Sequence, residues 1–159
     1  MKQEEIAKWL TWITYSIGMA GAVVFFFLVP IVAGQMRLEY PDAAWLYWPG
    51  LGCNFLVAAG CYLILYQFWT VCREIGRDNS FSMENARAFK RISRIAAGLA
   101  VVWFLALAGL TVVHALWAGI LLFLFFAIFT SFAVAICAAA LSHLVWKAYE
   151  MKQENELTI

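Results

Sequence analysis

Charged side chains are missing from three long stretches of this sequence. No Asp, Glu, Lys or Arg occurs between Trp9 and Met36, between Ala43 and Cys72, or between Ile95 and Trp146. These stretches contain 28, 30 and 52 residues. A bilayer core about 30 Å thick is crossed by roughly 20 apolar residues of helix, so the stretches predict one, one and two crossings. We therefore expect an all-α membrane protein with four transmembrane helices.

The same absence limits the chemistry that the membrane interior can carry. Ionisable residues inside spans are typical of ion-coupled transporters and voltage sensors, and no Asp, Glu, Lys or Arg lies there. No pair of carboxyl groups is available at that depth for acid–base catalysis. The sequence also lacks HExxH, GxSxG and P-loop strings, and its four cysteines form no CxxC pair. We expect no enzyme activity, no cofactor and no metal.

The composition leaves room for a single domain, residues 1–159. Hydrophobic residues make up 65% of the chain and charged residues 13%, whereas soluble domains are about half apolar and a quarter charged. The first apolar run is far longer than the core of a signal peptide, so we expect a retained helix. Short connections favour an up-down four-helix bundle. The expected spans are residues 9–31, 49–72, 95–113 and 119–146.

Lys and Arg are distributed unevenly between the two ends of these spans. Ten of the eleven lie before the first span, between spans 2 and 3, or after span 4, and Arg37 is the exception. Cytoplasmic loops carry the excess of Lys and Arg in membrane proteins. The distribution therefore predicts that both termini are cytoplasmic. An outer loop from Val32 to Tyr47 is expected to follow span 1, with Pro30 near the outer end of that span.

The connection between spans 2 and 3 contains turn and capping residues. Gly76 fits the left-handed position that ends a helix. Ser82 is a good N-cap, and Glu84 then lies in the first turn, where the helix dipole favours an acid. Residues 82–94 are expected to form a basic amphipathic segment at the inner membrane surface, with an apolar stripe that includes Phe89. Its basic residues, which face either water and lipid phosphate or a docked partner, are Arg87, Lys90, Arg91 and Arg94.

Small residues at helical spacing predict where the spans approach each other closely. Span 4 carries Ser131, Ala135 and Ala139 at steps of four residues, and His143 continues the series. The corresponding residues of spans 1 to 3 are Thr14, Gly18, Ala22, Gly52, Gly60, Ala96, Ala100 and Ala108.

The remaining polar groups of the spans are few. Hydrogen bonds between helices account for Asn54, Gln67, Thr130, Ser131 and Ser142. His114 is expected in an outer turn, residues 114–118, and His143 near the inner end of span 4. Because these histidines lie near opposite faces, they are not expected to ligate one haem or metal together.

Two strings resemble an uncharacterised four-span bacterial membrane family, catalogued as a domain of unknown function. Arg73–Ala96 resembles its connection between spans 2 and 3, and Glu154–Ile159 resembles its ending Glu-Asn-x-Leu-Thr-Ile. Met83 departs from the family, in which many members have Pro at this first helical position. The resemblance implies a bacterial inner-membrane location. The matching residues of the connection are Gly76, Phe81, Ser82, Glu84 and Asn85.

The resemblance also implies a partner, because genes of similar proteins often neighbour small helix-turn-helix regulators. Leu157 and Ile159 form an apolar tip that would dock in a groove or add a strand to a partner's sheet, unless the tail folds back on the bundle. We therefore expect an interaction protein that binds the lipid bilayer and a cytoplasmic regulator, without binding nucleic acid directly.

Two alternatives remain at this stage. The first is a homo-oligomeric transport or pore-forming subunit, with its path lined by Asn54, Gln67, Thr130 and Ser131. The second is a membrane enzyme or haem protein that uses His114 or His143.

Overall fold

A computed structural model describes residues 3–77 and 79–157 of the chain, and no strand occurs among them. In chain order the elements are α1 (Gln3–Val23), the π-helical turn η1 (Val24–Leu28), α2 (Val29–Glu39), the 3-10 helix η2 (Pro41–Leu46), α3 (Tyr47–Gly76), α4 (Met83–Val112) and α5 (Ala118–Leu157). α1, η1 and α2 follow one another without a break and form one rod.

Four helical rods are long and apolar enough to cross a bilayer, which confirms the predicted number of spans. They cover Glu5–Glu39, Pro41–Gly76, Met83–Val112 and Ala118–Asn155. At 1.5 Å per residue these rods are about 45 to 57 Å long, compared with a hydrocarbon core of roughly 30 Å. Each rod therefore extends beyond the hydrocarbon.

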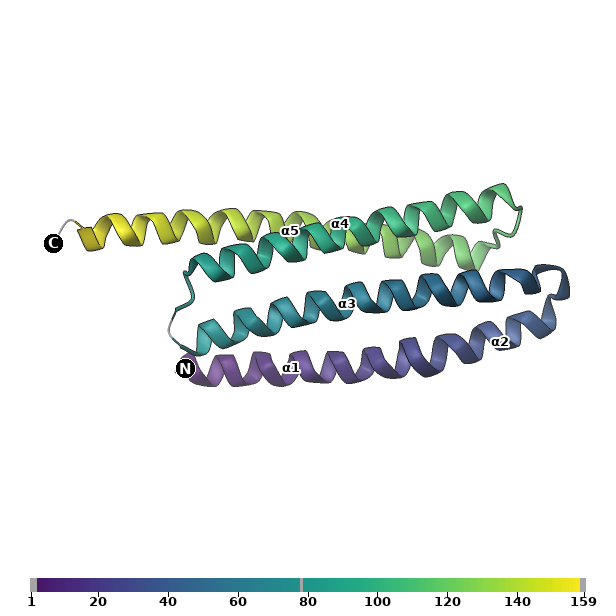
Figure 1. The fold of residues 1–159 in the computed structure, drawn as a ribbon, viewed down its shortest axis with the longest axis horizontal. Coiled ribbons are helices and arrows are strands. Elements are labelled where there is room, and N and C mark those ends of the chain that lie inside the picture. The colour runs from purple at the N-terminus through teal and green to yellow at the C-terminus, as the bar shows by residue number, and fades with distance from the viewer. Residues whose placement is uncertain (1–2, 78, 158–159) are drawn as a thin grey trace.

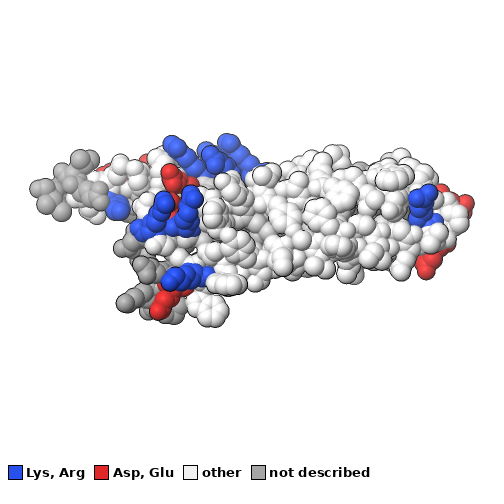
Figure 2. Space-filling model, turned by 60° about the horizontal axis from the view of Figure 1, so that its bottom comes forward, with Lys and Arg blue, Asp and Glu red and all other residues white. Residues whose placement is uncertain are grey.

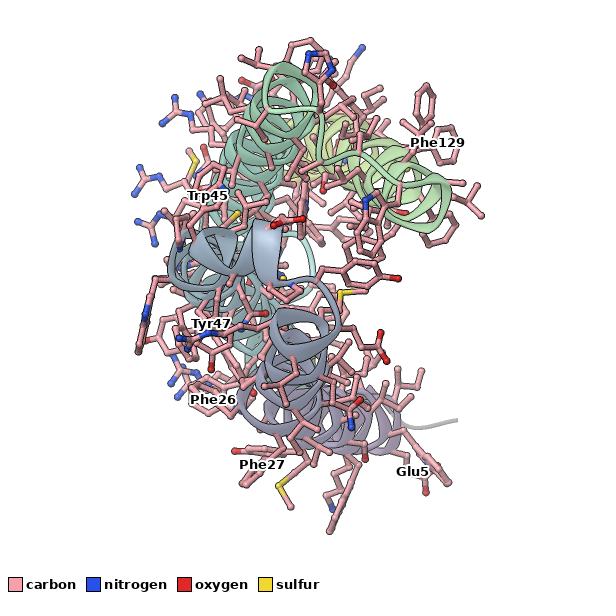
Figure 3. All side chains as sticks on the ribbon, turned by 90° about the vertical axis from the view of Figure 1, so that its right-hand side faces the viewer. Glu5, Phe26, Phe27, Trp45, Tyr47 and Phe129 are labelled. Carbon is pink, nitrogen blue, oxygen red and sulfur yellow. The ribbon has the colours of Figure 1, made fainter. Side chains whose placement is uncertain are left out.

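Successive rods lie antiparallel and side by side, in the predicted up-down order (Figure 1). α3 packs between the α1–α2 rod and α4, and α4 packs against α5. Seen from the end, the rods form an arc, and no described residue of α1 contacts α5 (Figure 3). The first and last rods therefore each pack along one side only, and their other sides are exposed.

Lys and Arg gather at the end of the bundle that carries both termini (Figures 1 and 2). We call this end the basic end; it consists of the first turns of α1, the connection 77–82 with the adjoining turns of α3 and α4, and the last turns of α5. A wide uncharged band separates it from the opposite end, where the α1–α2 rod turns into α3 (Figure 2). This band corresponds to the predicted spans.

Small residues allow α3 and α4 to approach closely. A Cβ added to Gly60 on α3 would lie 2.7 Å from Cδ2 of Leu99 on α4. Ala96, one turn before Leu99 on α4, and Ala100, directly after it, are each 1% exposed. These residues were predicted to lie at helix contacts, and the structure confirms it.

The contact face of α5 differs from the predicted ladder. Ala135 and Ala138 are buried, whereas Ala139 and His143 are exposed. Each step of four residues turns a helix by about 400°, so a strict i+4 series drifts by roughly 40° per step. The face therefore continues through Ala138 to Ser142, whose Oγ donates to the Ala86 carbonyl of α4 at 2.8 Å.

The first rod continues through Pro30 instead of ending there. Proline has no N–H to donate to the carbonyl four residues earlier, and its ring crowds that carbonyl. The π-helical turn η1 directly precedes this part of the rod and shifts its carbonyls out of the regular pattern. Asn54 Nδ2 on α3 donates to the Phe25 carbonyl of this turn at 3.0 Å. This hydrogen bond between helices was predicted for Asn54.

The outer loop predicted from Val32 to Tyr47 is wrong, since most of it is helical. α2 runs to Glu39, η2 follows, and Pro49 lies in the first turn of α3, where a proline loses no helical hydrogen bond. The Arg37 guanidinium lies 5.3 Å from the centre of the Tyr47 ring and links α2 to α3. Polar residues on a protruding helix end resemble a loop in the sequence, which explains the error.

His114 ends α4 in the left-handed conformation, with φ of 53°. Its N–H donates to the Thr111 carbonyl, and the Ala115 N–H donates to the Leu110 carbonyl, at 3.2 and 3.0 Å. This pair of hydrogen bonds is a Schellman motif, which usually has glycine at the left-handed position. The predicted turn at residues 114–118 therefore depends on the backbone of His114.

Replacing His114 by Gly should leave the melting temperature unchanged or raise it, because glycine adopts positive φ without strain. His114→Val should lower stability by about 1–2 kcal/mol, since a β-branched residue is strained there. Thermal unfolding in mild detergent, followed by circular dichroism, measures both. Equal losses of thermal stability in the two variants would contradict this role of His114.

Gly60→Val should destabilise the bundle by about 1–3 kcal/mol, because the added carbons overlap Leu99. Gly52→Val is the matched control on the same helix, since no atom outside its own turn lies within 4 Å of a Cβ there. Leu99→Ala should restore part of the stability of Gly60→Val. Equal melting temperatures for the two valine variants would show that the contact is not close.

Candidate interaction site at the basic end

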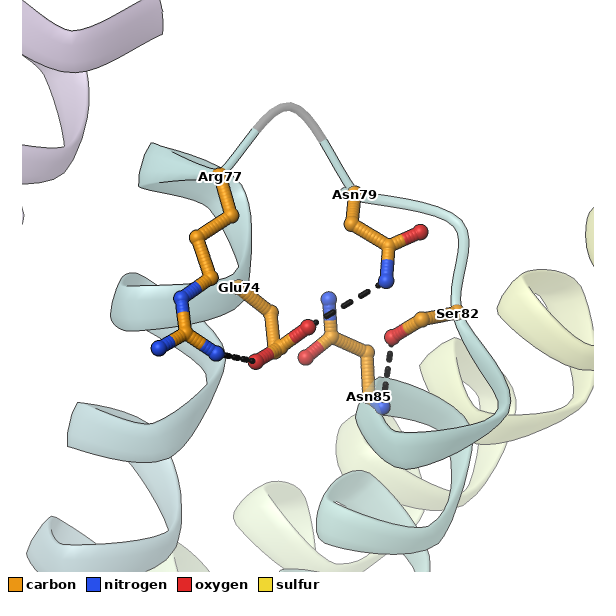
Figure 4. A network of polar contacts seen from close by, with 5 residues as sticks. All are labelled: Glu74, Arg77, Asn79, Ser82 and Asn85. Atoms are coloured by element: carbon orange, nitrogen blue, oxygen red, sulfur yellow. Dashed lines mark hydrogen bonds and ion pairs between the residues drawn. The ribbon is translucent and has the colours of Figure 1, made fainter.

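A network of polar contacts holds the connection between α3 and α4 (Figure 4). Glu74 is 4% exposed; its Oε1 lies 3.5 Å from Arg77 Nη1 and its Oε2 accepts from Asn79 Nδ2 at 3.2 Å. The Asn79 N–H also donates to the Glu74 carbonyl at 3.1 Å. Because the Arg77 side chain is 66% exposed, solvent weakens the ion pair. The buried carboxylate therefore depends mainly on the amide of Asn79.

Ser82 and Asn85 fix the start of α4. Ser82 has an extended backbone, and its Oγ accepts from the Asn85 N–H at 3.1 Å, as predicted for an N-cap. Asn85 is 1% exposed and donates from Nδ2 to the Ser80 carbonyl at 2.9 Å. Glu84 is exposed in the first turn, where it was predicted. The helix start and the connection before it are thus joined by buried hydrogen bonds.

Gly76 does not take the predicted left-handed conformation. It is the last residue of α3, and no described glycine has positive φ. A Cβ at Gly76 would lie 3.1 Å from the Cβ of Ala7, so glycine here lets α1 approach the end of α3. Phe81, another matching residue of the family-like string, is exposed.

The basic segment 82–94 is not a separate helix lying on the membrane surface. α4 is unbroken from Met83 to Val112, and Ala86, Ala88 and Ile92 are buried in the bundle while Phe89 is half-buried. Four basic residues, separated by three, one and three positions in the sequence, form one outward-facing row along the first turns of α4. We call this the basic row; it consists of the exposed residues Arg87, Lys90, Arg91 and Arg94.

α5 continues well past the start of α4 (Figure 1). The Ser142–Ala86 hydrogen bond places Ser142 beside the first turn of α4. Fifteen further residues of α5 follow Ser142, which corresponds to about 22 Å of helix. We call residues 147–157 the C-terminal extension, and residues 151–155 within it are all exposed.

Side-chain pairs one turn apart support this projecting helix. Trp146 Nε1 donates to Glu150 Oε1 at 2.6 Å, and Gln153 Nε2 donates to the Tyr149 hydroxyl at 2.7 Å. Such pairs add a few tenths of a kcal/mol each to a helix. The extension is therefore preformed as a helix and does not fold back on the bundle.

The apolar tip of the tail is only partly described. Leu157 is the last residue of α5, and nothing is described of its side chain; Ile159 lies outside the described residues. Since the backbone is helical up to Leu157, the extension suits docking in a groove rather than addition of a strand. The roles of Leu157 and Ile159 stay predictions.

The two histidines are far apart. His114 lies in the turn at the opposite end, and His143 is exposed on α5. The 25 residues of α5 between Ala118 and His143 alone span roughly 38 Å. No group of three or more His, Cys, Asp or Glu that could hold a metal occurs in the described part of the chain.

The polar residues suggested for a transport path are not brought together either. The Asn54 amide is occupied by the Phe25 carbonyl, and α3 and α5 have no contact within residues 3–77 and 79–157. The residues thus divided between α3 and α5 are Asn54, Gln67, Thr130 and Ser131. A path built by several copies of the chain stays a prediction.

Residues 31–159 match the family model DUF2975, described as a protein of unknown function. The chain belongs to this family. A relative from Bacillus subtilis (strain 168), the uncharacterized membrane protein YoaS, is 28% identical over 148 residues, which cover 90% of this chain and 91% of the relative. No solved structure matches. The predicted membership of an uncharacterised family is confirmed, and with four apolar helices it identifies a multi-pass membrane protein.

Glu74 is the main residue of the site that sequence reasoning missed. It is a single acid between Arg73 and Arg77, and its sequence resembles that of an exposed ion pair. No local signal in the sequence distinguishes it from an exposed acid, because its burial depends on how α3 and α4 pack.

Ser82→Ala should destabilise the start of α4 by about 1 kcal/mol, because the Asn85 N–H loses its acceptor. Faster hydrogen exchange of the Asn85 amide is the direct measurement. Ser80→Ala is the control, since only the backbone carbonyl of Ser80 takes part in the network. Equal exchange rates in both variants would contradict the capping role.

Proposed function

We propose that this protein is a non-enzymatic component of the bacterial inner membrane that binds a soluble regulatory protein at its basic end. The excess of Lys and Arg supports a cytoplasmic position for this end and for both termini. A cytoplasmic regulator would therefore meet the connection 77–82, the basic row and the C-terminal extension.

The observation that carries this proposal is the C-terminal extension. The charge-free part of α5 ends at Trp146, and the headgroup layer beyond the hydrocarbon is about 5–8 Å thick on each side. The extension adds roughly 16 Å of helix after Trp146 and so clears that layer. Residues 151–155 of the extension are all exposed. An exposed helix that projects beyond the headgroup layer suits a partner's groove.

The basic row supplies the second part of the surface. Its four cations lie along one side of α4, and none of them pairs with a carboxylate among the described residues. A partner bound here would present Asp and Glu to the row, since charge complementarity increases the association rate and fixes orientation. The resemblance to proteins whose genes neighbour helix-turn-helix regulators supports a regulator of that class as the partner.

Capture of cytoplasmic proteins on the detergent-solubilised full-length protein tests the proposal. Removal of residues 150–159 should abolish recovery of the partner, and replacing Arg87, Lys90 and Arg91 by Gln should reduce it by about tenfold at low salt. Mass spectrometry of the captured proteins identifies the partner.

Arg37→Gln, at the opposite end, is the matched control and should leave recovery unchanged. Partner recovery that survives both the truncation and the triple substitution would overturn the proposal. Loss of recovery with Arg37→Gln as well would indicate non-specific charge effects.

A further inference from the structure

A groove of about 520 Å³ runs between α1 and α3. It is lined by Thr14, Tyr15, Gly18, Met19, Ala22, Tyr62, Leu65, Tyr66 and Trp69. From residue 14 to residue 22 it extends along α1 for about 12 Å, close to the roughly 15 Å depth of one hydrocarbon leaflet. It lies in the half of the bundle nearer the basic end.

Most of the surface that lines the groove is apolar. Thr14 Oγ1 donates to the Leu10 carbonyl at 2.8 Å, and the Tyr62 hydroxyl donates to the Gly18 carbonyl at 2.8 Å. Gly18 has no side chain that would fill the groove, and aromatic rings form part of its walls. The surface that remains is apolar, and it suits a hydrocarbon chain.

The end of the groove toward the basic end carries positive charge. Trp69 lines the groove, and the guanidinium of Arg73, one turn further along α3, lies 5.2 Å from the centre of the Trp69 ring. Arg73 is exposed and pairs with no carboxylate among the described residues. Stacking on a tryptophan holds the guanidinium in place while its N–H groups remain available.

α1 supplies a second cation, Lys8, beyond the same end of the groove. Lys8 is exposed and lies seven residues before Tyr15, which is two turns along the same face of the helix. Arg73 and Lys8 both follow the groove toward the basic end, at the depth where lipid phosphates lie.

We propose that the groove binds one acyl chain of an anionic phospholipid and that Arg73 and Lys8 hold its phosphate. The bilayer supplies this occupant on every side, and the two cations select a negative headgroup. A zwitterionic lipid carries its own ammonium group, which opposes them. This site lies on α1 and α3, apart from the basic row on α4, and does not depend on the proposed partner.

Native mass spectrometry of the full-length protein tests the site, with phosphatidylglycerol and phosphatidylcholine of identical acyl chains. The wild type should retain one phosphatidylglycerol in preference to phosphatidylcholine. Arg73→Gln should reduce this preference by roughly fivefold, and Lys8→Gln by a similar factor. Arg87→Gln is the matched control, since it removes the cation of the basic row that lies farthest from the charge-free part of α4, and it should leave the preference unchanged.

Two further measurements separate the parts of the site. Gly18→Leu, which fills the groove, should lower retention of both lipids. If this variant does not fold, the effect of Arg73→Gln on the lipid preference still tests the proposal. Soluble glycerol 3-phosphate should not displace the lipid, and displacement would overturn the role of the acyl chain. Equal retention of both lipids by the wild type, or an Arg87→Gln loss as large as that of Arg73→Gln, would overturn the proposal.

Discussion

Hydrocarbon offers no hydrogen bonds, so a backbone group left without a partner inside the membrane costs several kcal/mol. Pro30 interrupts the hydrogen-bond pattern of the first rod, and the Asn54 amide on α3 supplies a donor to the Phe25 carbonyl of the widened turn. This contact fixes the register of the first rod against α3. Two further contacts between α1 and α3 follow in the same register toward the basic end. The Tyr62 hydroxyl donates to the Gly18 carbonyl, and Gly76 then faces Ala7. The groove and its cations depend on that alignment.

The arc has a related cause. In water, α1 and α5 would be driven together to hide their apolar sides, but lipid tails are as apolar as leucine and supply no such force. Helices in lipid associate where small residues permit close contact, as at Gly60 and Leu99. α1 and α5 meet no such surface on each other and remain apart. Buried polar contacts at the basic end, around Glu74 and Asn85, then fix the connection between α3 and α4.

Local signals in the sequence predicted the parts of this structure that depend on nearby residues. Charge-free stretches predicted the four spans, and Ser82 predicted the start of α4. Two of the errors concern contacts between distant residues. Gly76 lets Ala7, which lies 69 positions earlier in the sequence, pack against the end of α3. The burial of Glu74 depends on how α3 and α4 pack. The extent of α2 was missed because polar residues on a protruding helix resemble a loop. Arg87, Lys90, Arg91 and Arg94 were identified, but not their place on one continuous helix.

Depth in the membrane bears on the two interpretations of the basic row, lipid phosphate or protein partner. The charge-free part of α4 begins at Ile95, so Arg94 and Arg91 lie within about 6 Å of its edge, at the level of the headgroups. Arg87 lies roughly 12 Å from that edge, beyond them. On the proposed topology, the inner cations of the row would face lipid phosphate and the outer ones water. The outer cations and the C-terminal extension lie farthest from the charge-free band, and both lie at the same end of the bundle.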